Sequence, residues 1–312
     1  MRKSKNKTIL SYTTGLVLSI LVGIIVWLPQ LINDISSLNA WITNLVGLAI
    51  TILSGAFIFL KNREIRFLKH ETLFPFLFIL LFIGIAQTGQ VYPKNIQFNV
   101  GYVGLICTST AFYRLIYQSN KFMDPWHTME SMMLLSAGSL FMPILWVFIP
   151  IFWLGMEVFN KSSFRCIFSS FMGLITPYIL SLGVIYLMEA EDVICEFYEA
   201  IKSAYTISLP NNLYAWAGLI IFFISSIIGA SSLFNQHDDR RYTHWINNFG
   251  GIILLVSIIL NFLFYNDGIL NITTAFWATF LITSYYSNSN NLFPKIFFWL
   301  LLIISLGVIV LA

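Results

Sequence analysis

Long apolar runs alternate with short polar stretches from one end of the chain to the other. The hydrocarbon core of a bilayer is about 30 Å thick, and about 20 helical residues cross it. Runs that approach this length cover residues 9–28, 41–60, 73–88, 98–117, 131–159, 167–187, 214–234, 249–265, 272–287 and 296–312. Because a backbone in lipid must satisfy its own hydrogen bonds, and no dyad alternation typical of a barrel occurs, each run predicts helix. The pattern predicts an all-α, polytopic transmembrane bundle that forms one integral membrane domain over residues 1–312.

The run 131–159 is too long for one upright helix. At 1.5 Å per residue, its 29 residues would reach about 43 Å. Pro143 and Pro150 interrupt it, and each removes a helical hydrogen-bond donor. A broken or re-entrant hairpin over 131–159 therefore competes with a single crossing, and the hairpin gives about 11 membrane segments in total.

The distribution of basic residues decides between these two topologies. With a hairpin, 15 of the 17 Lys and Arg residues lie on one side of the membrane, whereas a single crossing gives a split of 11 against 6. Basic residues gather on the cytoplasmic side of membrane proteins. We therefore expect the hairpin, with the N-terminus inside and the C-terminus outside. The basic start of the chain leads into an apolar run without a small-residue cleavage site, which predicts a retained first span.

Composition removes several classes of protein. The chain is 58% hydrophobic and 10% charged, and its mean hydropathy is +0.80. Soluble globular chains carry about 25% charged residues. These values exclude a soluble enzyme, a disordered chain and a nucleic-acid binder. The three cysteines show no metal-ligand spacing, so the sequence predicts neither a metal site nor a cofactor.

An acidic segment, EAEDVICEFYEAIKSAY, predicts an amphipathic helix over residues 189–205 on the outer membrane surface. Its carboxylates share one helical face at i, i+3, i+7 and i+10: Glu189, Asp192, Glu196 and Glu199. The opposite face is apolar: Ala190, Ile194, Phe197 and Ile201. Two interpretations stand side by side. The acids form a solvated face, or they form a cluster that binds substrate, a cationic group or a divalent cation.

Two further positions carry candidate chemistry. Asp34 is the one carboxylate of the first outer loop, where partial burial would raise its pKa and suit it to act as a general base. The alternative is an ordinary polar loop residue. Arg240 and Arg241, in the polar run NQHDDRRYTHWINN, could bind a lipid headgroup phosphate through bidentate contacts. The alternative is that they only set the topology.

Three features of residues 70–200 form a recognisable pattern: AFYRLIYQ around Arg114, the broken apolar pair ending in Trp, and a Gly-Leu-x-x-Pro-Tyr span at Gly173, Leu174, Pro177 and Tyr178. With these features the chain resembles an uncharacterised family of polytopic inner-membrane proteins from Bacteroidetes-type bacteria. This resemblance implies a multi-pass protein of the bacterial inner membrane.

The layout also resembles, more distantly, that of the C-type glycosyltransferases, which use polyprenyl-phosphate-linked sugars. That resemblance implies envelope glycan assembly, with Asp34 as the catalytic residue. The chain departs from the pattern, because it lacks a paired acidic motif in the first outer loop and a large soluble outer domain.

Three functions follow from these observations. The first is a glycosyltransferase-like protein that takes a polyprenyl-linked sugar at the outer face. The second is a carrier or flippase for a lipidic or neutral solute, with the segment around Pro143 and Pro150 as its moving element. The third is a non-catalytic scaffold subunit that contacts partners through small residues such as Gly138, Gly173 and Gly183. Membrane lipid is an expected partner in all three, and nucleic acid in none.

Overall fold

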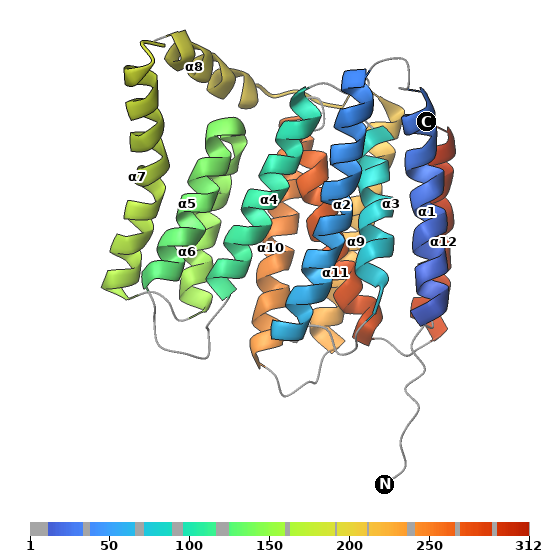
Figure 1. The fold of residues 1–312 in the computed structure, drawn as a ribbon. Coiled ribbons are helices and arrows are strands. Elements are labelled where there is room, and N and C mark those ends of the chain that lie inside the picture. Colours follow the sequence, from blue (N-terminus) through green and yellow to red (C-terminus); the bar gives the residue numbers. More distant parts are fainter. Residues whose placement is uncertain are drawn as a thin grey trace.

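The structure is a computed structural model that describes residues 12–33, 38–65, 72–88, 96–116, 125–159, 163–190, 192–210, 212–235, 241–265, 269–288 and 292–311. These residues form twelve α-helices and one short 3-10 helix (Figure 1). In chain order they are α1 (Tyr12–Asn33), α2 (Leu38–Ile65), α3 (Phe74–Thr88), α4 (Ile96–Ile116), α5 (Pro125–Phe141), η1 (Pro143–Val147), α6 (Phe148–Val158), α7 (Phe164–Leu187), α8 (Asp192–Ala204), α9 (Leu213–Asn235), α10 (Arg241–Leu263), α11 (Ile269–Asn288) and α12 (Leu292–Leu311).

The all-α prediction is confirmed for the part of the chain that the structure describes. Each predicted apolar run coincides with a helix or, for 131–159, with a helical pair. Four of the described helices are long and apolar enough to cross a membrane: Trp41–Asn62, Phe164–Leu187, Trp245–Leu263 and Pro294–Leu311. Shorter apolar helices account for most of the other runs. The total of about 11 membrane segments stays a prediction.

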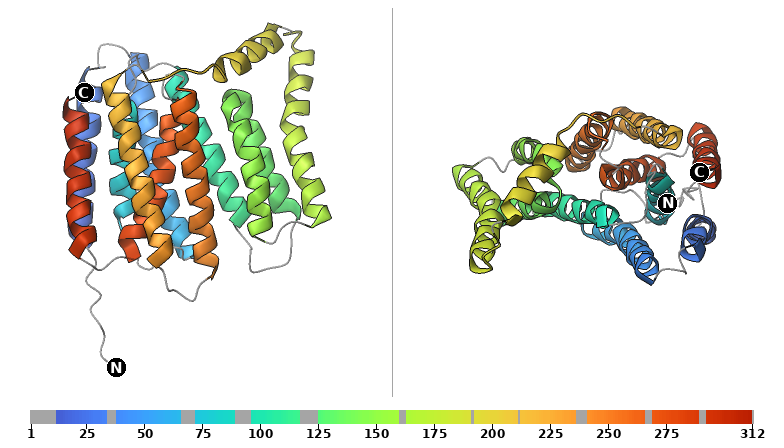
Figure 2. Two further views of the ribbon diagram at one scale, coloured as in Figure 1. Left: turned by 180° about the vertical axis from the view of Figure 1, so that it is seen from behind. Right: turned by 90° about the horizontal axis from the view of Figure 1, so that it is seen from above.

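Helices α3 and α11 form the centre of the larger group of helices (Figure 2). Helix α11 packs against α3, α4, α9 and α10, while α3 also contacts α1, α2 and α12. Aromatic rings join the two central helices, since Phe78 stacks on Tyr286 with ring centroids 5.6 Å apart. Phe78 also meets Phe298 of α12 edge to face at 5.8 Å. The core therefore lies around these two helices.

Helices α5, α6 and α7 form a second group at one side of the bundle (Figure 2). Helix α5 joins this group to α4, and α7 packs almost entirely on α5. The approach of α5 and α7 is close enough to require glycine, because a Cβ on Gly173 would collide with the carbonyl oxygen of Met129. Ser136 Oγ of α5 also donates to the Leu174 carbonyl of α7 at 2.6 Å.

The segment between α5 and α7 reverses direction. Thr128 contacts Cys166, and Ser139 contacts Tyr178, so α5 and α7 run parallel. Trp146 contacts Tyr178, whereas Trp153 contacts Ser170, so α6 runs antiparallel to α7. The chain therefore enters through α5, turns at η1 and returns through α6. This reversal agrees with the predicted hairpin, although its first arm begins at Pro125 rather than at residue 131.

Most described basic side chains lie at one end of the bundle, together with Glu130 and Glu157, and most described acids lie at the other end, together with Lys202. The basic end, where α1 begins, receives the end of α2 with Lys61, the end of α4 with Arg114, the start of α7 with Arg165 and the start of α12 with Lys295 (Figure 1). The acidic end carries α8, with Asp192, Glu196 and Glu199 (Figure 1). The structure thus places these described residues at the two ends that the charge pattern predicts.

Candidate functional site

The hairpin turns at Met142 and Pro143, below α8. The α5 helix ends where Met142 leaves helical geometry, with φ of −137° and ψ of 85°, and Pro143 opens the 3-10 turn η1. Proline lacks an amide proton and fixes φ, so it suits the first position of a new helical segment. In Figure 1 this pair of helices stops short of the level that α7 reaches, and α8 lies over it.

A network of hydroxyl and indole groups holds the tip in place. Trp146 Nε1 donates to Tyr178 Oη at 2.7 Å, and the hydroxyls of Tyr178 and Ser139 lie 2.6 Å apart. The ring of Phe197 on α8 packs against Tyr178, with centroids 6.5 Å apart. These contacts connect α5, η1, α7 and α8 at one point.

Tyr205 ties the end of α8 to the turn. Its hydroxyl donates to the Pro143 carbonyl at 3.1 Å, and its ring meets Phe264 edge to face at 5.9 Å. Burial raises the pKa of Tyr205, and the neighbouring Tyr178 raises it further, so the hydroxyl remains a donor at neutral pH. Ser208 then pairs with the end of α10, since its amide donates to Leu263 O at 3.1 Å and its carbonyl accepts from Tyr265 N at 3.0 Å.

These contacts enclose a cavity of about 200 Å³, which we call the hairpin-tip chamber. Its walls come from α4, from the tip, from the inner face of α8 and from the junction of α10 and α11. The main lining residues are Val100, Met142, Pro143, Ala200, Ala204 and Leu270. The lining is largely apolar, with Ser203 as its one hydroxyl side chain among the residues described. A cavity of this kind fits a small apolar or weakly polar group.

Polar side chains are buried next to the chamber. Asn261 Nδ2 donates to Thr274 Oγ1 at 2.8 Å, while Asn261 Oδ1 and Asn271 Oδ1 have no partner among the described residues. Thr273 Oγ1 is also buried and unpartnered. A Cβ on Gly104 would lie 2.7 Å from the Met142 sulfur and 3.4 Å from Thr273 Oγ1, so Thr273 lies close behind the tip. We refer to Asn261, Asn271, Thr273 and Thr274 together as the amide–hydroxyl cluster; among them, a hydrogen bond joins Asn261 to Thr274.

Unpartnered polar atoms continue along α11. Thr273, Trp277 and Ser284 lie at i, i+4 and i+11, on one helical face, and each has a buried polar atom without a partner in the part of the chain described. The Trp277 ring packs on Phe112 of α4 with centroids 4.7 Å apart, so this face is directed toward α4. An unpartnered buried polar group costs about 1–3 kcal/mol. Three such groups lie on this face of α11, and others lie on α1, α9, α10 and α12.

The buried interior is electrically neutral in the described residues. Every charged side chain that the structure describes is partly or largely exposed. The buried polar side chains are instead hydroxyls, amides and indoles, which hydrogen-bond to neutral groups. The arrangement can therefore recognise an uncharged, hydroxyl-bearing group beside an apolar chamber.

The predicted site residues lie in different places. Asp34 and Arg240 lie outside the described residues, and Arg241 opens α10 but its side chain is outside the described part. The acids Glu189, Asp192, Glu196 and Glu199 are all exposed. Among the described residues, no group of three His, Cys, Asp or Glu side chains could hold a metal ion.

Helix α8 itself begins at Asp192 rather than Glu189, because Glu189 adopts a positive φ of 54° as the chain leaves α7. The inner face of α8 contains Phe197, Ile201 and the buried Ala204, while Ile194, predicted to share that face, is exposed. Helix α8 borders the chamber with Ala200, Ser203 and Ala204, and the exposed Glu196 and Glu199 lie one turn before the first two of these residues.

Sequence reasoning missed the amide–hydroxyl cluster and Tyr205. The available signal was the run LNITTAFWATFLITSYYS, in which polar residues recur inside a helix long enough to be buried. The contact of Thr274 with Asn261 depends on the packing of α10 against α11, which no local pattern reports.

Together the fold and the chamber define an all-α protein with candidate membrane spans and a neutral polar interior. Residues 8–308 match the family of unknown function DUF6427, and the chain belongs to that family. The match confirms the predicted uncharacterised family and covers nearly the whole chain rather than residues 70–200 alone. No curated protein and no solved structure matches the chain.

Proposed function

We propose that this chain is a multi-pass carrier in the bacterial inner membrane for a neutral, hydroxyl-bearing lipidic solute. The N-terminus and the basic end lie in the cytoplasm, and α8 and the C-terminus lie outside. The α5–α6 pair is the re-entrant element that brings the number of membrane segments to about 11. The observation that carries the proposal is the chamber at the turn of this pair, backed by unpartnered neutral polar groups.

The broken pair supports the carrier interpretation. Non-helical backbone at membrane depth is tolerated where it is buried in protein or lines a cavity. Pro143 and Ile144 meet both conditions, since they are buried and line the chamber. Transporters commonly bind their substrates at interrupted helices. The tip is also held to the segment after α8 by the bond from Tyr205 to Pro143, and Ser208 bonds that segment to the end of α10; these bonds can break and reform during a cycle.

The polar face of α11 supports a route for the solute headgroup. From Thr273 to Ser284 it covers about 16 Å along the helix axis, roughly half of the hydrocarbon thickness of about 30 Å. Hydroxyl and indole groups on this face can replace the water that a neutral headgroup loses on entering the membrane. The absence of buried charge among the described side chains fits an uncharged cargo.

A transbilayer assay with a defined probe tests the carrier. The purified chain is reconstituted into vesicles that contain a monohexosyl diacylglycerol with a fluorescent label on one acyl chain, and a membrane-impermeant reductant bleaches the label from outside. The carrier predicts bleaching of the inner-leaflet label as well, and little movement of an equally labelled anionic phosphatidylglycerol. A bleaching level equal to that of protein-free vesicles would reject the carrier for this class of solute.

Matched variants locate the activity. Thr273→Val removes an unpartnered hydroxyl beside the tip, and we expect transport to fall about two- to tenfold, the equivalent of one lost hydrogen bond. Thr279→Val is the control, because Thr279 is equally buried on α11 but its hydroxyl donates to Ala275 O at 2.8 Å. Equal losses in both variants would contradict a role for the polar face.

The two prolines give a second matched pair. Pro143 is buried and lines the chamber, whereas Pro150 is exposed in the first turn of α6, where proline is well tolerated. We therefore expect Pro143→Ala to slow transport and Pro150→Ala to leave it unchanged, although the sequence alone treats the two alike.

A glycosyltransferase-like protein that uses a polyprenyl-linked sugar is the second candidate. One observation favours it: Ala200 and Ser203 of α8 line the chamber, within a turn of Glu196 and Glu199. The test is a mass profile of lipid-linked and surface glycans in a deletion strain complemented with wild type or with Asp34→Asn. Restoration by wild type alone would support Asp34 as the base, and restoration by both would favour the carrier.

A further inference from the structure

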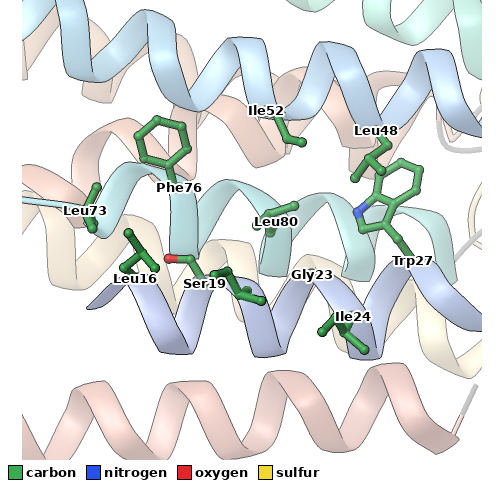
Figure 3. A pocket seen from close by; sticks show the side chains of 11 residues that line it. Leu16, Ser19, Gly23, Ile24, Trp27, Leu48, Ile52, Leu73, Phe76 and Leu80 are labelled. Carbon is green, nitrogen blue, oxygen red and sulfur yellow. The ribbon is translucent and has the colours of Figure 1, made fainter. Parts of the chain in front are cut away.

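A second cavity lies on the opposite side of the bundle, between α1, α2 and α3 (Figure 3). It has a volume of about 490 Å³, and we call it the α1–α3 groove. Its floor comes from Leu80 and Phe76 of α3, and its sides come from Gly23 and Trp27 of α1 and Leu48 of α2. We propose that the α1–α3 groove binds one acyl chain of an ester-linked membrane lipid, with Trp27 donating a hydrogen bond to the ester carbonyl oxygen.

The groove opens onto surface that faces the surroundings of the bundle. Leu16, Ile20 and Ile24 line it and expose between 43% and 54% of their area. Gly23 leaves room inside, because a Cβ there would meet only Leu80 Cδ1, at an ordinary contact distance of 3.7 Å. A flexible hydrocarbon chain can therefore enter sideways and lie against apolar walls.

Trp27 supplies the polar contact. The side chain is only 1% exposed, yet its indole nitrogen has no partner among the described residues. In Figure 3 that nitrogen points into the space between Leu48 and Leu80. The other polar side chain in the lining, Ser19, already donates to Gly15 O at 2.8 Å. Because buried indole N–H groups usually find an acceptor, the groove is built for a ligand that carries one.

The depth of Trp27 and the length of the groove indicate which class of ligand fits. Trp27 lies six residues before the end of α1, which is about 9 Å along the axis, so the N–H lies deeper than a phosphate at the helix end. Ester carbonyls are the acceptors next below the headgroup. From Trp27 to Leu16 the groove continues for about 16 Å, roughly one leaflet of a hydrocarbon core about 30 Å thick. A polyprenyl phosphate has no carbonyl oxygen, so it offers Trp27 no hydrogen-bond acceptor at this depth.

Native mass spectrometry of the full chain tests the proposal. Detergent-purified protein is mixed with equal amounts of ester-linked and ether-linked phosphatidylglycerol of the same chain length, which differ in the carbonyl alone. We expect retained lipid with an ester preference of about two- to tenfold, the effect of one hydrogen bond. Equal retention of the two lipids, or displacement of both by an equal amount of polyprenyl phosphate, would overturn the proposal.

Three variants test the contribution of the lipid acyl chain separately from that of its ester carbonyl. Gly23→Leu fills the groove and is expected to lose the lipid, whereas Gly183→Leu, on α7 with open space around its Cβ position, keeps it. Trp27→Phe preserves the aromatic volume and is expected to retain lipid without the ester preference. Lipid retention by Gly23→Leu at the wild-type level, or an unchanged ester preference in Trp27→Phe, would overturn the proposal. Trp27→Phe keeps the test decisive if Gly23→Leu fails to fold.

Discussion

The two central helices, α3 and α11, are both largely buried, but α3 is mostly apolar whereas α11 contains many polar side chains. Ten of the 15 residues of helix α3 are Phe, Leu or Ile, and its buried side chains pack against other apolar side chains. Helix α11 is buried from Leu270 to Ile282 and beyond, but it contains Asn, Thr and Ser at many of those positions. Some of these groups bond to the backbone of their own helix, as Thr274 and Thr279 do. Others have no partner in the described part of the chain.

This difference separates stability from function. An apolar bundle gains nothing in stability from an unpartnered hydroxyl, which is worse buried than a methyl group. The apolar side chains of helix α3 therefore stabilise the fold, whereas the unpartnered polar groups of α11 add no stability and serve another purpose. We interpret that purpose as contact with a neutral solute.

The largest effect is expected in α3. Phe78 is fully buried and contacts the rings of Phe82, Tyr286 and Phe298. Phe78→Ala should therefore lower the free energy of unfolding by about 3–5 kcal/mol, because both contacts and packed volume are lost. Reversible denaturation in mixed micelles measures it. A loss below that of Thr279→Val would remove α3 from the centre of the core.

An intermediate effect is expected where a hydroxyl of α11 is bonded. Thr279→Val removes the hydrogen bond to Ala275 and should cost about 0.5–1.5 kcal/mol. Thr273→Val removes a hydroxyl without a partner and should leave the free energy of unfolding unchanged or slightly higher. The same denaturation assay compares the two. A destabilised Thr273→Val would mean that this hydroxyl has a structural partner, and the contrast between α3 and α11 would fail.

The smallest effect is expected from a change of pH, which acts on the hydrogen bond between Tyr205 and Pro143 at the hairpin tip. The pKa of Tyr205 is raised in the folded state by burial, so the bond from its hydroxyl to Pro143 persists below the ordinary tyrosine value and is lost as the pH rises through the folded value. We expect the melting temperature of the wild type to fall toward that of Tyr205→Phe only in strongly alkaline solution. A difference between the two proteins that disappears near neutral pH would contradict this assignment.

The sequence predicts the helices well because apolar length is a local property. The run 73–88 matches α3 at Phe74–Thr88, whereas the run 249–265 misses the first turns of α10, which begin in polar sequence at Arg241. The reversal near Pro143 also follows from the sequence, since two prolines and the charge distribution both favour it.

The candidate site could not be predicted in the same way. Asn261 and Thr274 come together only because α10 packs on α11, and Tyr205 reaches Pro143 from 62 residues away. Sequence reasoning instead selected charged residues, because charge is conspicuous in an apolar chain. The acids of α8 are exposed, and Asp34 lies outside the described residues, so its role as a base stays a prediction.

The short hairpin has a consequence for the bilayer around it. Helix α5 has 17 residues and α6 has 11, which correspond to about 26 Å and about 17 Å, less than a hydrocarbon core of about 30 Å. With α8 lying across its tip, the pair stands beside α7, which has 24 residues and is about 36 Å long (Figure 1). In the proposed membrane arrangement, lipid that touches α5 and α6 therefore meets a shorter apolar surface than lipid beside α7.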